Sequence, residues 1–178
     1  MIKTMAAGLA LMAAALPAAV MAQEGAKLDC VLQDTADDLK ESLFTAMMAS
    51  DTEAREPLFA QLRVFTTSCA ERHGIAEDHR RSYFNYSLSR MMRDRLIEAL
   101  AGLGISALPV DRALDFGPDG SNPALEGGIT DEQLESIEQA YQADGVDFDN
   151  LDEAGLERIG MYAAITSIYW TSRADLPF

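Results

Sequence analysis

Hydrophobic positions recur along most of this chain at the three- and four-residue spacing of helices that bury one face. Alternation of β-branched and polar residues, the pattern of a strand, is weak throughout. The pattern therefore predicts an all-α bundle of about five main helices. These helices are expected at about residues 30–49, 57–74, 78–103, 130–143 and 152–173.

The last expected helix, residues 152–173, is apolar on almost every side. Residues 159–172 carry no charge, but this run is shorter than the roughly 20 residues that cross a bilayer. Small residues fall on one line of the helix, at Gly160, Ala163 and Ser167. We therefore predict that this helix is the centre of the bundle and that a neighbouring helix approaches it closely along the small residues.

The first two helices predict a disulfide bond. A turn at residues 50–52 separates them, Pro57 fits the first turn of the second helix, and Gly74 ends it. Cys30 and Cys69 lie at similar distances on either side of the turn, so an antiparallel hairpin would bring them together at its open end. A redox-active pair normally has a closer spacing such as C-x-x-C. We therefore expect a disulfide-closed N-terminal helical hairpin.

The third helix carries most of the positive charge. Between Arg72 and Arg95 there are six arginines and only three acidic residues. Aromatic residues are interleaved with these arginines, a combination that binds anionic or sugar-like ligands and also binds a protein's own carboxylates. Arg81 and Arg95 fall within the apolar stripe, and Arg95 at least is expected to pair with a carboxylate from another helix. The residues predicted to form an anionic-ligand or partner face are Arg80, Arg81, Tyr83 and Arg90.

The amino-terminal segment has the features of a secretory signal peptide. Lys3 precedes an apolar run, Pro17 breaks that run, and Ala22 is the small residue expected before the cleavage point. The run is too short for a permanent membrane anchor. We expect cleavage after Ala22, a single helical domain over residues 23–178 with no membrane span, and a periplasmic or secreted location, where disulfides persist.

Charge limits the class of partner. The chain has 14 basic and 29 acidic residues and a net charge of −15, and loss of Lys3, the only charged residue of the first 22, would leave −16. Such a surface repels nucleic acid, so no nucleic-acid partner is expected.

Residues 104–128 are rich in glycine and proline and form a long connection, in which a short helix is expected at residues 109–115. Asp115, Asp119, Gly120 and Glu126 stand at positions 1, 5, 6 and 12 of a calcium-loop template. Position 3 is a glycine, and Asp and Gly are ordinary turn residues, so a turn is the favoured interpretation.

Local sequence marks the start of the last two helices. Thr130 and Gln133 have the spacing of a capping box. Asp149 or Asn150, in the acidic turn before the last helix, is expected to cap that helix.

Residues that would indicate catalysis are sparse. The chain contains no G-x-S-x-G, H-E-x-x-H or C-x-x-C motif and no phosphate-binding glycine loop. The two histidines, His73 and His79, are six residues apart, which does not place two ligands on one helix face. We therefore predict no catalytic residue, metal site or cofactor, and an enzyme is the less favoured class.

Two functional hypotheses follow. The first is a non-enzymatic exported protein that contacts another envelope protein as an accessory subunit, chaperone or inhibitor. The second is a binder of small anionic ligands, or an unrecognised hydrolase, that uses the arginine and aromatic face of the third helix together with His79. A cleft at the arginines would favour the second hypothesis, and a convex face would favour the first.

Overall fold

The computed structural model describes residues 16–114 and 129–178, and over these residues the chain is all-α, as expected. No strand occurs in the described ranges, and none of their helices has the length and apolar character needed to cross a bilayer. The helices are α1 (Leu16–Asp34), α2 (Asp37–Met48), α3 (Thr52–His73), α4 (Arg80–Gly102), α5 (Leu108–Leu114), α6 (Asp131–Ala143) and α7 (Glu153–Ala174), with short 3-10 turns at Glu77–His79 and Phe148–Asn150.

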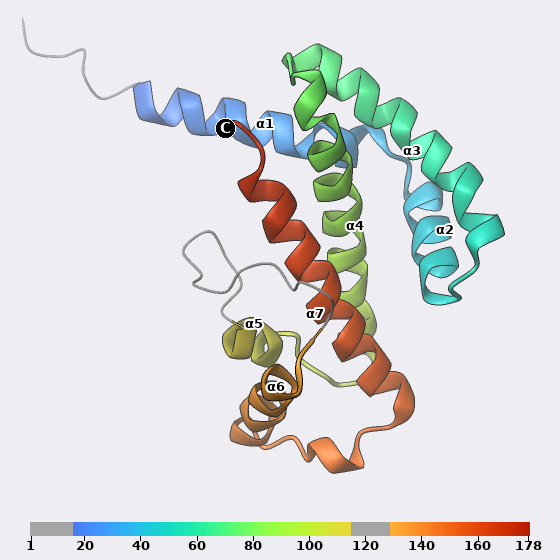
Figure 1. Ribbon diagram of the computed structural model, residues 1–178, viewed down its shortest axis with the longest axis vertical. Helices are drawn as coiled ribbons and strands as arrows, with labels where there is room; N and C mark the ends of the chain where they lie inside the picture. Colours follow the sequence, from blue (N-terminus) through green and yellow to red (C-terminus); the bar gives the residue numbers. More distant parts are fainter. Residues whose placement is uncertain (1–15, 115–128) are drawn as a thin grey trace, which may run out of the picture.

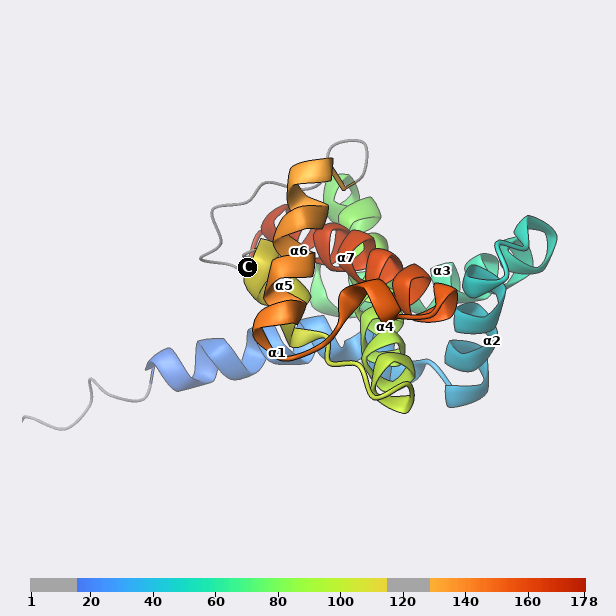
Figure 2. The same ribbon diagram turned by 90° about the horizontal axis from the view of Figure 1, so that it is seen from below.

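Two long helices, α4 and α7, form the centre of the structure and make its most extensive helix–helix contact. Figures 1 and 2 show α2 and α3 on one side of this pair and α5 and α6 on the other. The α7 helix buries Tyr162 and Ala163 completely, while Leu156 and Ile168 stay partly exposed. The prediction of a central last helix is confirmed.

Of the expected stripe of small residues, Ala163 and Ser167 are buried, and a further close contact lies outside the stripe, at Gly155. A Cβ atom added at Gly155 would lie 2.9 Å from Cδ1 of Ile105, whereas one added at Gly160 would meet nothing within 4 Å. The helix also begins differently. Asp152 is its N-cap and accepts a 2.7 Å hydrogen bond from the amide of Gly155, so the expectation of a cap at residue 149 or 150 is wrong. Those residues belong to the preceding 3-10 turn.

The expected first helix, residues 30–49, is in fact two helices. Thr35 donates its hydroxyl to the carbonyl of Val31 at 2.6 Å, and the chain turns at Ala36 before α2 begins. Helical periodicity continues through the break, so spacing alone does not reveal it. As a result Cys30 lies in α1, while α2 and α3 form the hairpin.

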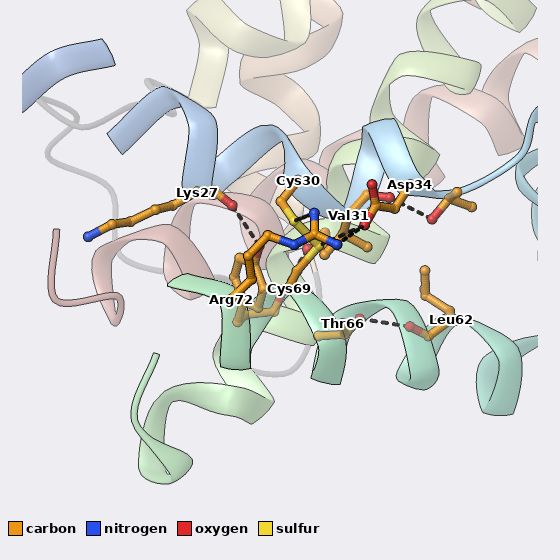
Figure 3. The surroundings of a disulfide bond; sticks show 11 residues. Lys27, Cys30, Val31, Asp34, Leu62, Thr66, Cys69 and Arg72 are labelled. Atoms are coloured by element: carbon orange, nitrogen blue, oxygen red, sulfur yellow. Dashed lines mark hydrogen bonds and ion pairs between the residues drawn. A yellow bond between two sulfur atoms is a disulfide. The ribbon is translucent and has the colours of Figure 1, made fainter. Parts of the chain in front are cut away.

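The predicted disulfide joins Cys30 to Cys69, with a Cα–Cα distance of 5.9 Å, and ties α1 to α3. Arg72, one turn after Cys69, donates to Asp34 at 2.9 Å and lies 3.2 Å from the sulfur of Cys30 (Figure 3). Figure 3 also shows Thr66, one turn before Cys69, whose hydroxyl donates to the carbonyl of Leu62 at 2.9 Å.

Four tyrosines are buried in the core. Tyr83 donates to the carbonyl of Lys27 at 2.6 Å, and Tyr141 donates to that of Ser106 at 2.7 Å. Burial, which disfavours the charged phenolate, raises the pKa of Tyr83 and of Tyr141 to about 12. Burial also raises the pKa of the other two buried tyrosines, Tyr86 and Tyr162, and by more.

The carboxyl end of the chain docks on the fold. Leu176 is buried, and the ring of Phe178 lies 4.8 Å from Nζ of Lys27 in α1. Figure 1 shows the terminus beside α1. The first and last described helices are therefore joined at the same end of the molecule.

The connection between α4 and α6 is described only in part. The short helix expected at residues 109–115 is α5, and the capping box of Thr130 and Gln133 is confirmed at the start of α6. The calcium-template residues lie outside the described residues, as do residues 1–15 of the expected signal peptide. The template residues are Asp115, Asp119, Gly120 and Glu126.

Candidate functional site

Most arginines of the positive segment are paired with carboxylates of the fold. Arg72 contacts Asp34 at 2.9 Å, Arg90 contacts Asp29 at 2.6 Å and Arg93 contacts Asp111 at 3.2 Å. In each of these pairs the carboxylate comes from another helix, so the pair links α3 or α4 to α1 or α5. These arginines serve the structure.

Arg95 is paired with two carboxylates, and one of them comes from another helix, as expected. Its shortest contact is with Glu98 of the same helix, at 2.9 Å, and Glu41 of α2 lies 3.8 Å away. Hydrogen bonding to Glu98 raises the pKa of the Arg95 guanidinium. Glu98 is exposed and the Arg95–Glu98 pair spans one turn of a single helix, so this pair contributes little to stability.

Two arginines of the segment have no such partner. Across the described part of the chain, no carboxylate lies within 4.0 Å of Arg80 or Arg81. Both line a pocket of about 420 Å³ between α3 and the start of α4. We call it the arginine pocket, and its lining residues are Arg63, Thr66, Thr67, Arg80, Arg81, Phe84 and Asn85.

The backbone brings these side chains together through a tight reversal. Gly74 adopts a left-handed conformation with φ of 65°, which ends α3 and allows the chain to return as α4. Figure 1 shows α3 and α4 meeting at this end. The last turns of α3 therefore face the first turns of α4 across the pocket.

The third guanidinium of the pocket is held by an aromatic ring. The Arg63 guanidinium lies 5.7 Å from the ring centre of Phe84, which itself makes an edge contact with Phe59. Among the described residues Arg63 forms an ion pair with Glu56, which is 3.4 Å long and has both side chains exposed, so the interaction is weak. The cation–π contact holds Arg63 over the pocket.

The electrostatics of the arginine pocket are unusual for so acidic a chain. Its lining contains three arginines and no acidic residue. The Nε atom of Arg80 is buried and has no hydrogen-bond partner among the described residues. The Nε atom of Arg93, in a different part of α4, is buried without a partner in the same way, so the pocket is distinguished by its charge and not by this donor.

The structure separates the four residues that the sequence grouped into one face. Arg80 and Arg81 lie together in the pocket. Tyr83 is fully buried with its hydroxyl bonded to Lys27, and Arg90 is paired with Asp29 on the side of α1. Tyr83 and Arg90 therefore contribute to the α1 contact and are not among the residues that line the pocket.

Sequence analysis did not identify Arg63, Thr66, Thr67 or Asn85 as site residues. Arg63 lies outside the arginine-rich segment, on a different helix, and its relation to Arg80 depends on how α3 and α4 pack. The spacing of Arg63, Thr66 and Thr67 at i, i+3 and i+4 does place them on one helix face, and this was the available signal.

A second pocket, of about 480 Å³, lies near the other end of α4. Its charged groups are paired with each other: Arg93 contacts Asp111 at 3.2 Å, and Asp111 accepts a 3.0 Å hydrogen bond from the hydroxyl of Tyr162, although Nε of Arg93 is buried without a hydrogen-bond partner among the described residues. We call it the Asp111 pocket, and it is lined by Arg93, Ile97, Ala101, Gly104, Ile105, Ser106, Ala107, Leu108, Asp111 and Tyr162.

Metal-binding geometry is sparse in the described ranges. The one cluster there with metal-ligand spacing is Cys30, Asp34 and Cys69, and its two sulfurs are joined in the disulfide. The guanidinium of Arg72 also contacts Asp34 and would repel a cation. His79 lies 3.9 Å from Asp78 and is not among the residues that line the arginine pocket.

Comparison with protein-family models, with curated proteins and with solved structures finds no match to this chain. A function is therefore inferred from the residues of the chain itself.

Proposed function

We propose that this chain is an exported, non-enzymatic helical protein that binds an anionic ligand in the arginine pocket. The observation that carries the proposal is the convergence of Arg63, Arg80 and Arg81 on one hollow without an acidic lining residue. Guanidinium groups bind oxyanions through charge-assisted hydrogen bonds, which are about twice as strong as neutral ones.

The lining supports binding more than catalysis. The residues that surround the pocket include no histidine, carboxylate or thiol that could act as a general base or strong nucleophile. The hydrolase variant of the hypothesis required His79 in the pocket, and that residue faces Asp78 outside it. We therefore assign no reaction to the pocket.

Export is supported by the amino-terminal sequence and by the disulfide, which is typical of oxidising compartments. Contact with another envelope protein is the first of the two hypotheses from the sequence, and ligand binding is the second. The first hypothesis depends on overall charge, whereas the pocket depends on the positions of particular groups. The arrangement of the arginines favours ligand binding over that alternative.

Thermal unfolding in a panel of carboxylates, sulfonates and organic phosphates at constant ionic strength tests the proposal. A ligand present at about 100 times its Kd stabilises a protein by roughly 2.7 kcal/mol, which corresponds to a rise in Tm of roughly 5–10 °C for a chain of this size. We expect at least one class of anion to produce such a rise in the purified protein.

Two variants make the test specific. Arg81→Gln should abolish the rise in Tm, because it removes one of the three charges of the pocket. Arg112→Gln is the matched control, since Arg112 is an exposed arginine paired with Asp144 away from the pocket lining, and it should respond like the natural protein. A panel without any rise, or a rise retained in Arg81→Gln, would contradict the proposal. Export is checked separately by sequencing the amino terminus of the protein purified from its native host, which should begin at Gln23.

A further inference from the structure

We infer that the ligand of the arginine pocket is a soluble phosphate monoester. This inference rests on the proposed function and narrows it to one class of anion. The first reason is charge. A monocarboxylate brings a single negative charge to three guanidinium groups, whereas a phosphate monoester carries about −1.5 to −2 at pH 7.

The second reason is the direction from which the donors come. Arg63 belongs to α3, whereas Arg80 and Arg81 belong to α4, so donors are offered from two walls of the pocket. A planar carboxylate is satisfied by one arginine in a two-pronged contact. The three terminal oxygens of a phosphate point in different directions and accept hydrogen bonds from several groups at once.

The remaining lining residues fit the same ligand. Asn85 supplies an amide that can donate, and Thr67 supplies an exposed hydroxyl. The hydroxyl of Thr66 already donates to the carbonyl of Leu62, so it adds no donor.

Pocket size points to an organic phosphate over the inorganic ion. The hollow of about 420 Å³ falls within the range of sites for small organic molecules. Phe84 lends an apolar surface beside the arginines. A ligand with a phosphate at one end and a small organic body at the other would use both parts.

A phosphate group could also be presented by a lipid, and the charge of the protein argues against that source. The net charge of −15 is repelled by an anionic bilayer, whereas a small soluble ligand needs only the local positive charge of the pocket. We therefore assign the pocket to a soluble ligand.

Calorimetric titration with two probes of equal body tests the inference. Phenyl phosphate and benzoate share the phenyl ring and differ in the anion. We expect phenyl phosphate to bind the purified protein at least about tenfold more tightly than benzoate. Arg80→Gln and Arg81→Gln should each weaken phenyl phosphate binding about tenfold or more, because each removes a charge-assisted hydrogen bond.

Folding of each variant is checked by its unfolding temperature without ligand. Arg81 is exposed, so its variant is expected to remain folded and to decide the test if Arg80→Gln is unstable. Arg112→Gln is again the control and should bind phenyl phosphate like the natural protein.

The possible results separate this inference from the proposed function. Equal or tighter binding of benzoate, lost in Arg81→Gln, would overturn the phosphate assignment and leave anion binding in place. Absence of binding by both probes, or binding that the pocket variants do not change, would count against both. Cosedimentation with phosphatidylcholine vesicles containing phosphatidic acid, dependent on Arg81 and without binding of phenyl phosphate, would overturn the soluble source.

Discussion

Two pockets of similar size lie toward opposite ends of α4, at about 420 and 480 Å³, and they differ in the state of their charges. In the Asp111 pocket, Arg93 is paired with Asp111, which also accepts a hydrogen bond from Tyr162. In the arginine pocket, three guanidinium groups share a lining with no acidic residue. A pocket by itself does not indicate a binding site, whereas arginines without carboxylate partners in its lining favour one.

The comparison also separates two uses of arginine along one helix. Arg90 and Arg93 connect α4 to α1 and α5, and their contribution is to the fold. Arg80 and Arg81 have no carboxylate partner in the described part of the chain, so their charge is available to a ligand. The three experiments below act on this difference, beginning with the largest expected effect.

Raising the pH should unfold the protein completely, because its buried tyrosines would have to ionise. The arginines of the arginine pocket keep their charge over the same pH range. The pKa of Tyr83 and of Tyr141 is about 12 in the folded protein because of burial, against about 10 in an unfolded chain. Their contribution to stability is therefore fully present below pH 10 and is lost as the pH rises through about 12. Tyr162, in the Asp111 pocket, has its pKa raised in the same direction.

Circular dichroism and tyrosinate absorbance, recorded together, check this expectation. Both should change in one step between about pH 10 and 12. An absorbance rise near pH 10 with an unchanged helical signal would mean that the tyrosines titrate freely in the folded protein.

Removal of the disulfide should destabilise the helix beside the arginine pocket more than the helices beside the Asp111 pocket. Cys69 lies in α3, one turn after Thr66, which lines the arginine pocket. The double variant Cys30→Ser, Cys69→Ser should lower the free energy of unfolding by roughly 4 kcal/mol, the chain-entropy value for a sequence separation of 39 residues. Urea denaturation measures the loss, and amide hydrogen exchange should increase more in α3 than in α6. A loss below about 1 kcal/mol, or equal increases in both helices, would contradict the expectation.

Asp111→Asn should convert the Asp111 pocket into a weak copy of the arginine pocket. It leaves Arg93 without a carboxylate at a site where about a quarter of each partner's side chain is exposed, so we expect a loss of about 2 kcal/mol in unfolding free energy. We also expect a second, weaker binding event for phenyl phosphate, seen by calorimetry.

The matched control for that experiment is the stability of Arg81→Gln. Because Arg81 has no ion pair to lose in the described structure, its replacement should change the unfolding free energy by less than about 0.5 kcal/mol. A loss as large as that of Asp111→Asn would show that Arg81 has a structural role, and the contrast between the pockets would fail.

Features of the fold that depend on local chemistry were predictable from sequence. These features include the capping box of Thr130 and Gln133 and the uncharged stretch of α7, which depend on residues close in sequence. They also include the disulfide, because its two cysteines lie at similar distances on either side of a turn. The break at Ala36 was not predictable in this way. It depends on the hydroxyl of Thr35 bonding back to Val31 and on the packing of α1 across α3, and neither changes the helical spacing.

The candidate site was predictable only in part, because helical spacing does not say which tyrosines and arginines point inward. Tyr83 and Arg81 are two residues apart, yet one is in the core and the other lines the pocket. Tyrosine has both an apolar ring and a polar tip, so its burial depends on finding an acceptor such as the carbonyl of Lys27. Arg63 joins the site only through the packing of α3 against α4.

The contact between Phe178 and Lys27 has a consequence for the order of assembly. Lys27 is synthesised 151 residues before Phe178, so this contact cannot form until all of the intervening chain has been made. The α4–α7 contact is completed almost as late, since α7 occupies the carboxyl end. The part of α1 around Lys27 therefore lacks Phe178 as a partner until late in synthesis, and a tag fused after Phe178 would extend from a point beside α1.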